Sequence, residues 1–405
     1  MYSTTTTSRF SCLLLLALAS CAEGGDEDRP KSEIPINAQH HMFGLRTLRG
    51  FGTFPVNPSV VVPDRGLLNL FDNSTYTITR QSSTSTADRY AIESTGELAI
   101  FVTGSGSEPS VVFRGGYGVT ASASEYFFTD RVTTTASPSV GLYYGTRRVA
   151  GQVELEGAWH VMSLHTIFGQ AILTPENVAR GTFGAVTITA GTPGTLRTIS
   201  GTGTQGTATQ GTSGVVLGGQ IQNVLDGAGS GDGTCNLSVS YQVGAQPVDS
   251  RTMQSAATAN LVLALDEDET DDEAGTLFMV RKFDTATPVD GGLVVGRYLV
   301  GGHTVFTNPS NCGSDAFVGV VTLGVGNSFR LDATGANGAD FTYSGNYTLA
   351  QDGVLTISIN GTNETWHAAI DRGYRTLVFL DDFFEVRANN NPELNIGFGV
   401  REKTN

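Results

Sequence analysis

The sequence predicts an all-β protein made of three tandem small antiparallel β-barrels of the up-and-down type. The first reason is composition: the chain has 51 glycines, and long helical patterns are nearly absent. Glycine supplies turns with positive φ, and the many Thr and Val residues suit a pleated strand because they are β-branched. The second reason is length, because 405 residues exceed one hydrophobic core and favour two or three domains.

The third reason is an internal repeat. Residues 90–117 align without a gap on residues 347–374. In both segments a tyrosine precedes a glycine turn, at Gly96 and Gly353, and two apolar residues at spacing two follow. This pattern predicts a β-hairpin with one apolar face.

The repeat extends outward from this hairpin. An opening run from Gly44 pairs with a run from Gly296, and the closing runs place Arg147 opposite Arg401. Roughly 105 residues therefore recur at the two ends of the chain.

The middle third is predicted to be a longer, diverged third copy. It opens with GAWHVM from Gly157 and closes with LFMVRK, which carries Arg281. A Gly/Thr/Gln tract at 201–214 is expected to form a loop or a long hairpin. The predicted barrels are 41–150, 151–290 and 291–405.

Closure of each unit follows from its strand count. Turn signals roughly every 8 to 12 residues give each unit about eight short strands. A sheet of that length curls and closes, which removes exposed edges that promote aggregation. A β-sandwich is the alternative that periodicity alone leaves open.

The N-terminus predicts export. Residues 1–20 hold a positive Arg9 and an apolar run at 12–19, too short to span a bilayer. The run ends in LASC, which resembles the bacterial lipobox and implies that Cys21 is lipidated and becomes the mature N-terminus. In that family's sorting rule Ala22, in place of Asp, implies the outer membrane, on its periplasmic face or at the cell surface. A plain secretory signal before a coincidental cysteine is the alternative.

Residues 21–40 are acidic and polar and are predicted to form a flexible tether. The formal net charge of -15 argues against nucleic acid as a partner, because phosphate binding needs clustered Lys and Arg. Export and lipidation remove Cys12 and Cys21 from the free thiols. Cys235 and Cys312 then either pair in a disulfide or stay buried and free.

One motif resembles the lipocalins. The Gly-Ala-Trp run ending at Trp159 is similar to their Gly-x-Trp opening, and Arg281 is similar to the arginine of their last strand. The resemblance implies that Arg281 packs across Trp159 in a cation-π contact and closes the barrel. Tyr298 with Arg401 is a weaker form in the third unit, and the first has Arg147 without the aromatic residue.

Candidate chemical groups favour structural explanations. The acidic tract at 266–273 and the Gly-rich turn at 226–233 are possible weak Ca²⁺ sites, better explained as hairpin tips. Neighbouring strand residues point to opposite faces, so Asp381-Asp382 is poorly placed for acid-base work. His165 and His303 are expected at equivalent packing positions. We predict no catalytic residues, no metal site and no cofactor.

The leading hypothesis for function is a non-enzymatic binding or scaffold protein, anchored by lipid at the outer membrane. Its partner would be another envelope protein. The alternative is a lipocalin-like carrier of a small apolar ligand, which large inward side chains would exclude and many small ones would favour. An enzyme of unknown class is a remote third hypothesis.

Overall fold

The structure, a computed structural model, describes residues 32–48, 61–80, 88–103, 109–118, 125–130, 139–167, 179–192, 194–207, 211–242, 249–266, 273–306, 313–336, 338–381 and 393–403. These ranges form 24 strands and one short helix. The strands close into three antiparallel barrels of eight.

The strands follow the chain order within each barrel. Barrel one consists of β1 (Ala38–Leu48), β2 (Val61–Leu70), β3 (Thr75–Arg80), β4 (Asp88–Ile92), β5 (Glu97–Thr103), β6 (Pro109–Tyr117), β7 (Glu125–Asp130) and β8 (Ser139–Arg147). Barrel two consists of β9 (Gly157–Ile167), β10 (Ala179–Ile188), β11 (Arg197–Gly206), β12 (Gly211–Leu225), β13 (Gly231–Gln242), β14 (Asp249–Ala257), β15 (Leu261–Asp266) and β16 (Glu273–Arg281). Barrel three follows α2 (Gly291–Val294) and consists of β17 (Gly296–Phe306), β18 (Gly313–Leu323), β19 (Ser328–Gly335), β20 (Asp340–Leu349), β21 (Val354–Ile359), β22 (Thr365–Ile370), β23 (Thr376–Asp381) and β24 (Glu393–Arg401).

The three barrels share one connectivity. Each strand pairs with the next along the chain, and the first pairs with the eighth. The prediction of three up-and-down barrels is therefore confirmed, and a sandwich is excluded because each sheet closes on itself. β1 begins at Ala38, so the last residues of the predicted tether belong to barrel one. The 201–214 tract lies mostly in β11 and β12, which pair as a long hairpin.

The pairing of first and last strands defines equivalent positions in the repeat. The closing pairs are His40 with Arg147, Trp159 with Arg281, and Tyr298 with Arg401. The sequence alignment of Gly44 with Gly296 is therefore wrong by six residues, since Ala38 stands where Gly296 does. The error arose because β1 opens with Ala-Gln-His and has neither the glycine nor the aromatic residue of the other two barrels.

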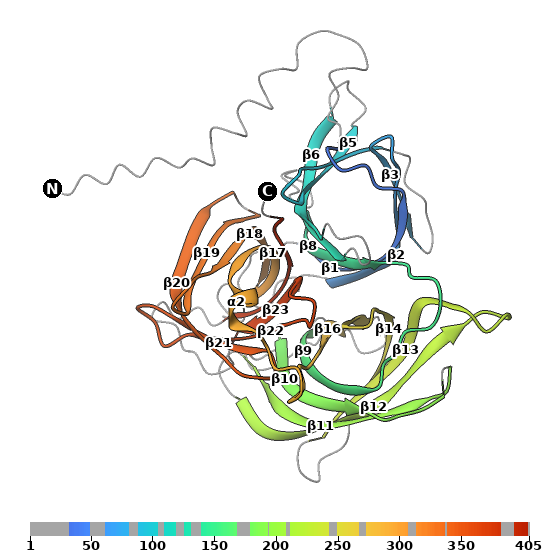
Figure 1. The fold of residues 1–405 in the computed structure, drawn as a ribbon. Helices are drawn as coiled ribbons and strands as arrows, with labels where there is room; N and C mark the ends of the chain where they lie inside the picture. Colours follow the sequence, from blue (N-terminus) through green and yellow to red (C-terminus); the bar gives the residue numbers. More distant parts are fainter. Residues whose placement is uncertain are drawn as a thin grey trace, which may run out of the picture.

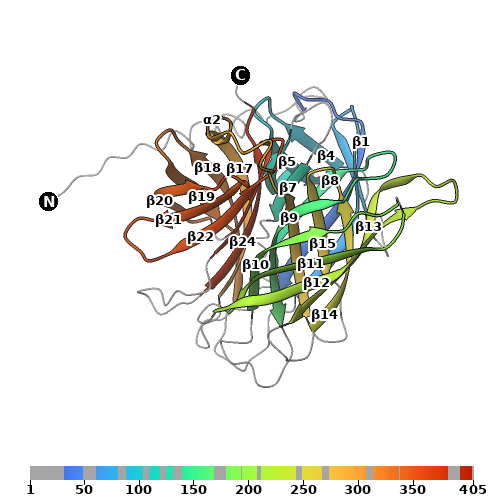
Figure 2. The same ribbon diagram turned by 60° about the horizontal axis from the view of Figure 1, so that its bottom comes forward.

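The barrels stand side by side around a common centre (Figures 1 and 2). We call the end at which each first strand begins, at Ala38, Gly157 and Gly296, the plugged end. Hydrogen bonds join the plugged ends of neighbouring barrels, so the three plugged ends point the same way.

Side chains fill the inside of each barrel. Barrels one and three are rich in buried rings, among them Tyr90, Tyr117, Phe329 and Trp366, and barrel two is filled mainly by aliphatic side chains. Inward glycines make room for neighbouring side chains. A Cβ on Gly44 would lie 2.3 Å from a ring atom of Tyr143, and one on Gly302 would lie 2.2 Å from a ring atom of Phe317. A Cβ on Gly184 would lie 2.7 Å from Leu217 Cδ1. These glycines therefore accommodate side chains and leave no lumen beside them.

A fourth apolar cluster lies between the barrels. It takes buried residues from the outer walls of all three, mainly from β7 and β8, β15 and β16, and β23 and β24. At its centre the rings of Tyr144, Phe278 and Phe398 touch, with centroid distances of 4.8 Å for the first pair and 5.5 Å for the last. Each ring lies three residues before the arginine that ends the last strand of its barrel: Arg147, Arg281 or Arg401. The barrels are therefore joined around an approximate threefold axis and share one core.

Candidate functional site

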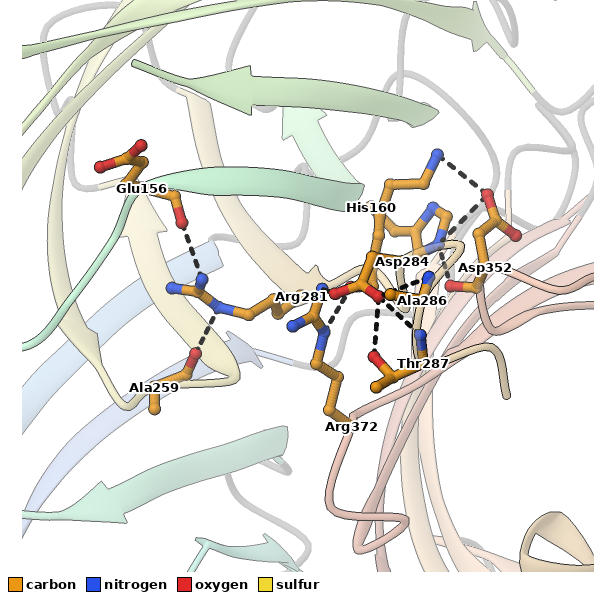
Figure 3. A network of polar contacts seen from close by, with 10 residues as sticks. Glu156, His160, Ala259, Arg281, Asp284, Ala286, Thr287, Asp352 and Arg372 are labelled. Atoms are coloured by element: carbon orange, nitrogen blue, oxygen red, sulfur yellow. Dashed lines mark hydrogen bonds and ion pairs between the residues drawn. The ribbon is translucent and has the colours of Figure 1, made fainter. Parts of the chain in front are cut away.

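The plugged end of barrel two is closed by Arg281 and Trp159. The guanidinium carbon lies 4.5 Å from the centroid of the buried indole, within the range of a cation-π contact. Arg281 Nε donates to Ala259 O at 2.6 Å, and Nη1 donates to Glu156 O at 2.7 Å (Figure 3). The indole Nε1 donates to Leu155 O at 2.9 Å. Arg281 therefore joins the end of β16 to the segment before β9 and to the turn between β14 and β15.

Barrel three has a looser version of this closure. Arg401 lies 5.6 Å from the ring centroid of Tyr298 and donates to Val295 O at 2.8 Å. The hydroxyl of Tyr298 donates to Val294 O at 3.0 Å, at the end of α2. The helix and the arginine together cover this end of the barrel.

Barrel one uses a different closure. Arg147 is exposed, and its register partner is the buried His40. His40 Nε2 lies 2.9 Å from the hydroxyl of Tyr117, and its ring packs edge-on against Tyr126. Burial, together with the nearby charge of Arg147, lowers the pKa of His40 to about 3, so the imidazole is neutral.

Barrel two is joined to barrel three by His160, the residue after Trp159. Its Nε2 donates to Asp352 O at 3.0 Å and lies 3.8 Å from Asp352 Oδ2. Lys282 Nζ lies 2.9 Å from the same carboxylate (Figure 3). Burial lowers the pKa of His160, so the neutral ring donates this bond. Asp352 belongs to the turn between β20 and β21.

Barrel one is joined to barrel two by equivalent residues. His41 Nε2 donates to Asp232 O at 3.0 Å, and Arg148 forms an ion pair with the Asp232 carboxylate. His41 follows the closing position of β1 as His160 follows that of β9. Asp232 precedes Gly233, which has a positive φ of 87°, as Asp352 precedes Gly353 with a φ of 94°. We call these two sets of contacts the His-Asp clasps.

Barrel three meets barrel one at the equivalent turn without a histidine. Lys403 N donates to Thr95 O at 3.0 Å, as Phe283 N donates to Asp352 O at 3.1 Å in the second clasp. Leu299 stands where His160 stands, and a Cβ on Gly96 would touch its Cδ1 at 3.7 Å. Each barrel thus contacts the same turn of the next one, and the three contacts form a ring.

A second polar group supports the link between barrels two and three. The Asp284 carboxylate accepts hydrogen bonds from the Thr287 backbone and hydroxyl groups, at 2.7 and 2.8 Å, and pairs with Arg372 at 3.2 Å (Figure 3). Arg372 also donates to Lys282 O at 2.5 Å. These bonds hold the segment between the barrels against the turn after β22.

Two surface hollows lie beside the clasps. One, of about 290 Å³, lies between β1–β3 and β13–β14 and includes His41 and Thr234. The other, of about 400 Å³, lies between β9–β11 and the β20–β21 turn and includes His160 and Asp352. They occupy equivalent places, where two convex barrel walls meet. Packing of round walls explains both hollows without a ligand.

A buried ionic cluster lies inside barrel two, toward the end opposite Trp159. Arg251 Nη1 is 3.0 Å from Asp266 Oδ2 and 3.1 Å from His165 Nδ1. Burial alone would raise the pKa of Asp266, but hydrogen bonds and charge from His165 and Arg251 lower it. The expected equivalence of His165 and His303 is wrong. Odd-numbered positions of β9 and β17 face opposite sides, so His165 lies inside its barrel and His303 lies in its outer wall.

The other sequence candidates are explained locally or lie outside the described residues. Asp226 accepts hydrogen bonds from the backbone of Ala228 and Ser230, at 3.0 and 2.9 Å, and so stabilises its own turn. Asp381 is buried at the end of β23. Residues 267–272 of the acidic tract and the residue after Asp381 are outside the described ranges, as is Cys21.

Cys235 is a buried free thiol whose Sγ donates to Asn223 Oδ1 at 3.3 Å. Cys312 lies outside the described residues, so whether it pairs with Cys235 stays a prediction.

Within the described ranges, no group of three or more His, Cys, Asp and Glu residues is placed to hold a metal ion. No helix among these residues has the length and apolar character needed to cross a membrane.

Comparison with known proteins gives weak structural likenesses only. No protein family matches the sequence, and no curated protein does. Transferrin binding protein B from Haemophilus parasuis Hp5, as a double mutant, is 9% identical with a TM-score of 0.30, over 93% of this chain and 78% of that one. Intact Ap-TbpB, with N and C lobes, is 9% identical with a TM-score of 0.28, over 95% and 82%. A Nostoc punctiforme protein of unknown function is 8% identical with a TM-score of 0.21, over 61% and 96%. Scores this low support no conclusion about family or function.

Proposed function

We propose that this chain is an exported lipoprotein, anchored through Cys21 at the outer membrane, that acts as a non-enzymatic binding or scaffold protein. The observation that carries the proposal is the shared core of the three barrels. A protein that must present surfaces in a fixed arrangement benefits from such fusion, because no barrel can rotate against its neighbours. Three independent carriers would not need it.

The packing of the barrels supports a scaffold over a carrier of a small apolar ligand. Apolar ligand sites are cavities that enclose most of the ligand. Here the inward positions hold buried rings such as Tyr143 and Phe317, and inward glycines lie against these rings. The described residues therefore favour the filled barrel of the two possibilities set out from the sequence.

Two measurements test this proposal. Native mass spectrometry of protein purified from its own cell should give the mass of the chain with its N-terminal lipid and no further ligand. A retained, separable lipid would support the carrier hypothesis. Cross-linking in intact envelopes should then join the protein to a defined envelope protein. If every cross-link were internal, a binding role would lose its support.

The anchor is tested separately. Replacing the lipidation residue, Cys21→Ala, should move the protein from the membrane fraction to the soluble fraction, because each buried CH₂ of an acyl chain contributes about 0.8 kcal/mol to membrane binding. A Ser20→Ala variant keeps the cysteine and serves as the control. Retention of Cys21→Ala in membranes would contradict the lipoprotein hypothesis.

A further inference from the structure

The chain enters the folded region at the plugged end. Ser32 N donates to Ser74 Oγ at 2.9 Å, in the turn between β2 and β3, and Glu33 N donates to Ile92 O at 3.0 Å. β1 then starts at this end of barrel one. Only 11 residue steps separate Cys21 from Ser32. A chain of that length spans at most about 40 Å when fully extended.

The same end exposes apolar side chains at equivalent turns. The turn between the second and third strands carries Phe71 in barrel one, Leu196 in barrel two and Val325 in barrel three. Their exposed fractions are 37%, 55% and 88%. Leu293, on α2 at this end of barrel three, is 50% exposed.

Single exposed apolar residues are common on protein surfaces and carry no meaning by themselves. Here, however, the turn between the second and third strands carries one in each of the three barrels, although at a different place within the turn in each. The residues around them are the usual turn formers, such as the glycines on both sides of Val325. Nothing in turn geometry requires Phe, Leu or Val between them.

We propose that the plugged end faces the membrane and that Phe71, Leu196 and Val325 contact the lipid interface. The inference rests on the proposed lipid anchor, because the short tether brings this end to the bilayer. Three separate turns on three fused barrels would hold the axes of the barrels upright. The opposite ends would then point away from the membrane, toward a partner.

Lipid is the occupant that the observations favour. The tether ends at this face, so an anchored molecule keeps the face within reach of the bilayer at all times. The side chains are apolar and spaced around the molecule, one per barrel, which suits a flat surface. With a formal net charge of -15 the protein gains nothing from anionic headgroups, so a neutral lipid surface is expected.

The test uses the full lipoprotein in phosphatidylcholine vesicles, with a fluorophore on one introduced cysteine in a Cys312→Ser background. Val325→Cys places the label at the plugged end of barrel three. Asn363→Cys places it in the turn between β21 and β22, at the opposite end of the same barrel, as the matched control. Cys235 is buried and stays unlabelled. Quenching by a lipid-borne nitroxide should be at least several-fold stronger at 325 than at 363. Equal or reversed quenching would overturn the orientation.

A second variant tests the turns themselves. Combining Phe71→Ser, Leu196→Ser and Val325→Ser should reduce nitroxide quenching of a label at Leu293→Cys at least twofold. Val216→Ser, which changes an exposed apolar side chain on the wall of barrel two, should leave it unchanged. If the label at position 293 is quenched as fully in the triple variant as in the protein with the three turns unchanged, the turns do not contact lipid.

The outcomes separate this inference from the proposed anchor. Absence of an acyl mass on Cys21 would refute the anchor, whereas an acylated protein with no quenching difference would refute only the orientation. A label at 325 that a water-soluble quencher reaches in vesicles, but not in native envelopes, would assign the face to a protein partner and overturn the lipid contact.

Discussion

Tyr144 of barrel one lies edge to face against Phe278 of barrel two, with 4.8 Å between the ring centroids. Both rings belong to outer walls, so this contact belongs to the molecule as a whole and to neither barrel alone. The Tyr144 hydroxyl donates to Ala264 O at 3.0 Å in the same interface. Two residues 134 positions apart therefore join the repeats at the centre of the shared core.

Phe278→Ala should destabilise the protein by about 3 to 5 kcal/mol, because it leaves a cavity where three barrels meet. Hydrogen exchange should rise in β8, β16 and β24 alike. Leu217→Ala, inside barrel two, is the matched control and should raise exchange first in barrel two. Exchange confined to barrel two in both variants would show that the barrels do not share a core.

Arg281→Lys should cost about 1 to 3 kcal/mol, since lysine keeps the charge but loses the planar guanidinium that stacks on Trp159 and spans several carbonyls. Chemical denaturation at neutral pH measures this cost. Arg330→Lys, on an exposed arginine, is the control and should change stability by less than about 0.5 kcal/mol. Equal effects of the two substitutions would argue against a closing role for Arg281.

The closed barrels could be predicted from the sequence because strand alternation and the repeat are local signals. The resemblance to the lipocalin opening led to Arg281, and the repeat led to Arg401, and both lie over the predicted ring. The same role for Arg147 is wrong, because Arg147 is exposed and its register partner is His40. The alignment of the first strand failed because the sequence at Gly44 matches by chance, while the true equivalent opens with His40 in place of an aromatic residue. The structure alone shows that His40 fills this place.

The fusion of the barrels was missed, although a signal for it exists. β15 reads LVLALD and β23 reads TLVFLD, without the alternation of a strand that has one wet face. Both are buried along their whole length. Such runs indicate burial on both faces, and hence an outer wall that packs against something. Which walls meet depends on three-dimensional arrangement, which no local pattern contains.

Acid should weaken the fold through its buried histidines. Burial lowers the pKa of His303 from 6.5 to about 4, so the unfolded chain binds this proton at a higher pH than the folded one. The contribution of the neutral His303 ring to the free energy of unfolding is complete above pH 6.5 and is lost as the pH falls toward 4. Protonation linked to His303 should lower the free energy of unfolding by up to about 2 kcal/mol between pH 7 and pH 5. His303→Leu should therefore flatten the profile of stability against pH in this range. An unchanged slope would show that other groups cause the pH dependence.

Glu125 should act in the opposite direction. Burial, with the charge of Asp371, raises the pKa of Glu125 to about 7, well above its usual 4.5. Ionisation therefore costs stability as the pH rises through this range. Glu125→Gln should stabilise the protein by up to about 3 kcal/mol at pH 8 and by little at pH 5. Glu402→Gln, on a carboxylate paired with Arg297, is the control. A gain from Glu125→Gln that does not depend on pH would contradict this assignment.

Cys235 should be unreactive until the protein unfolds. Its thiol is buried, and burial raises its pKa to about 12, so almost no thiolate exists at pH 8 to attack an alkylating reagent. In a soluble Cys21→Ala, Cys312→Ser variant, made without the signal segment, Cys235 is the single remaining thiol. Mass analysis after brief iodoacetamide treatment should show no adduct on folded protein and one adduct in guanidinium. The Cys21→Ala protein with Cys312 retained should give two adducts in guanidinium without reductant; none would show that Cys235 and Cys312 are joined. Labelling of the folded variant would show that barrel two opens near Asn223 under native conditions.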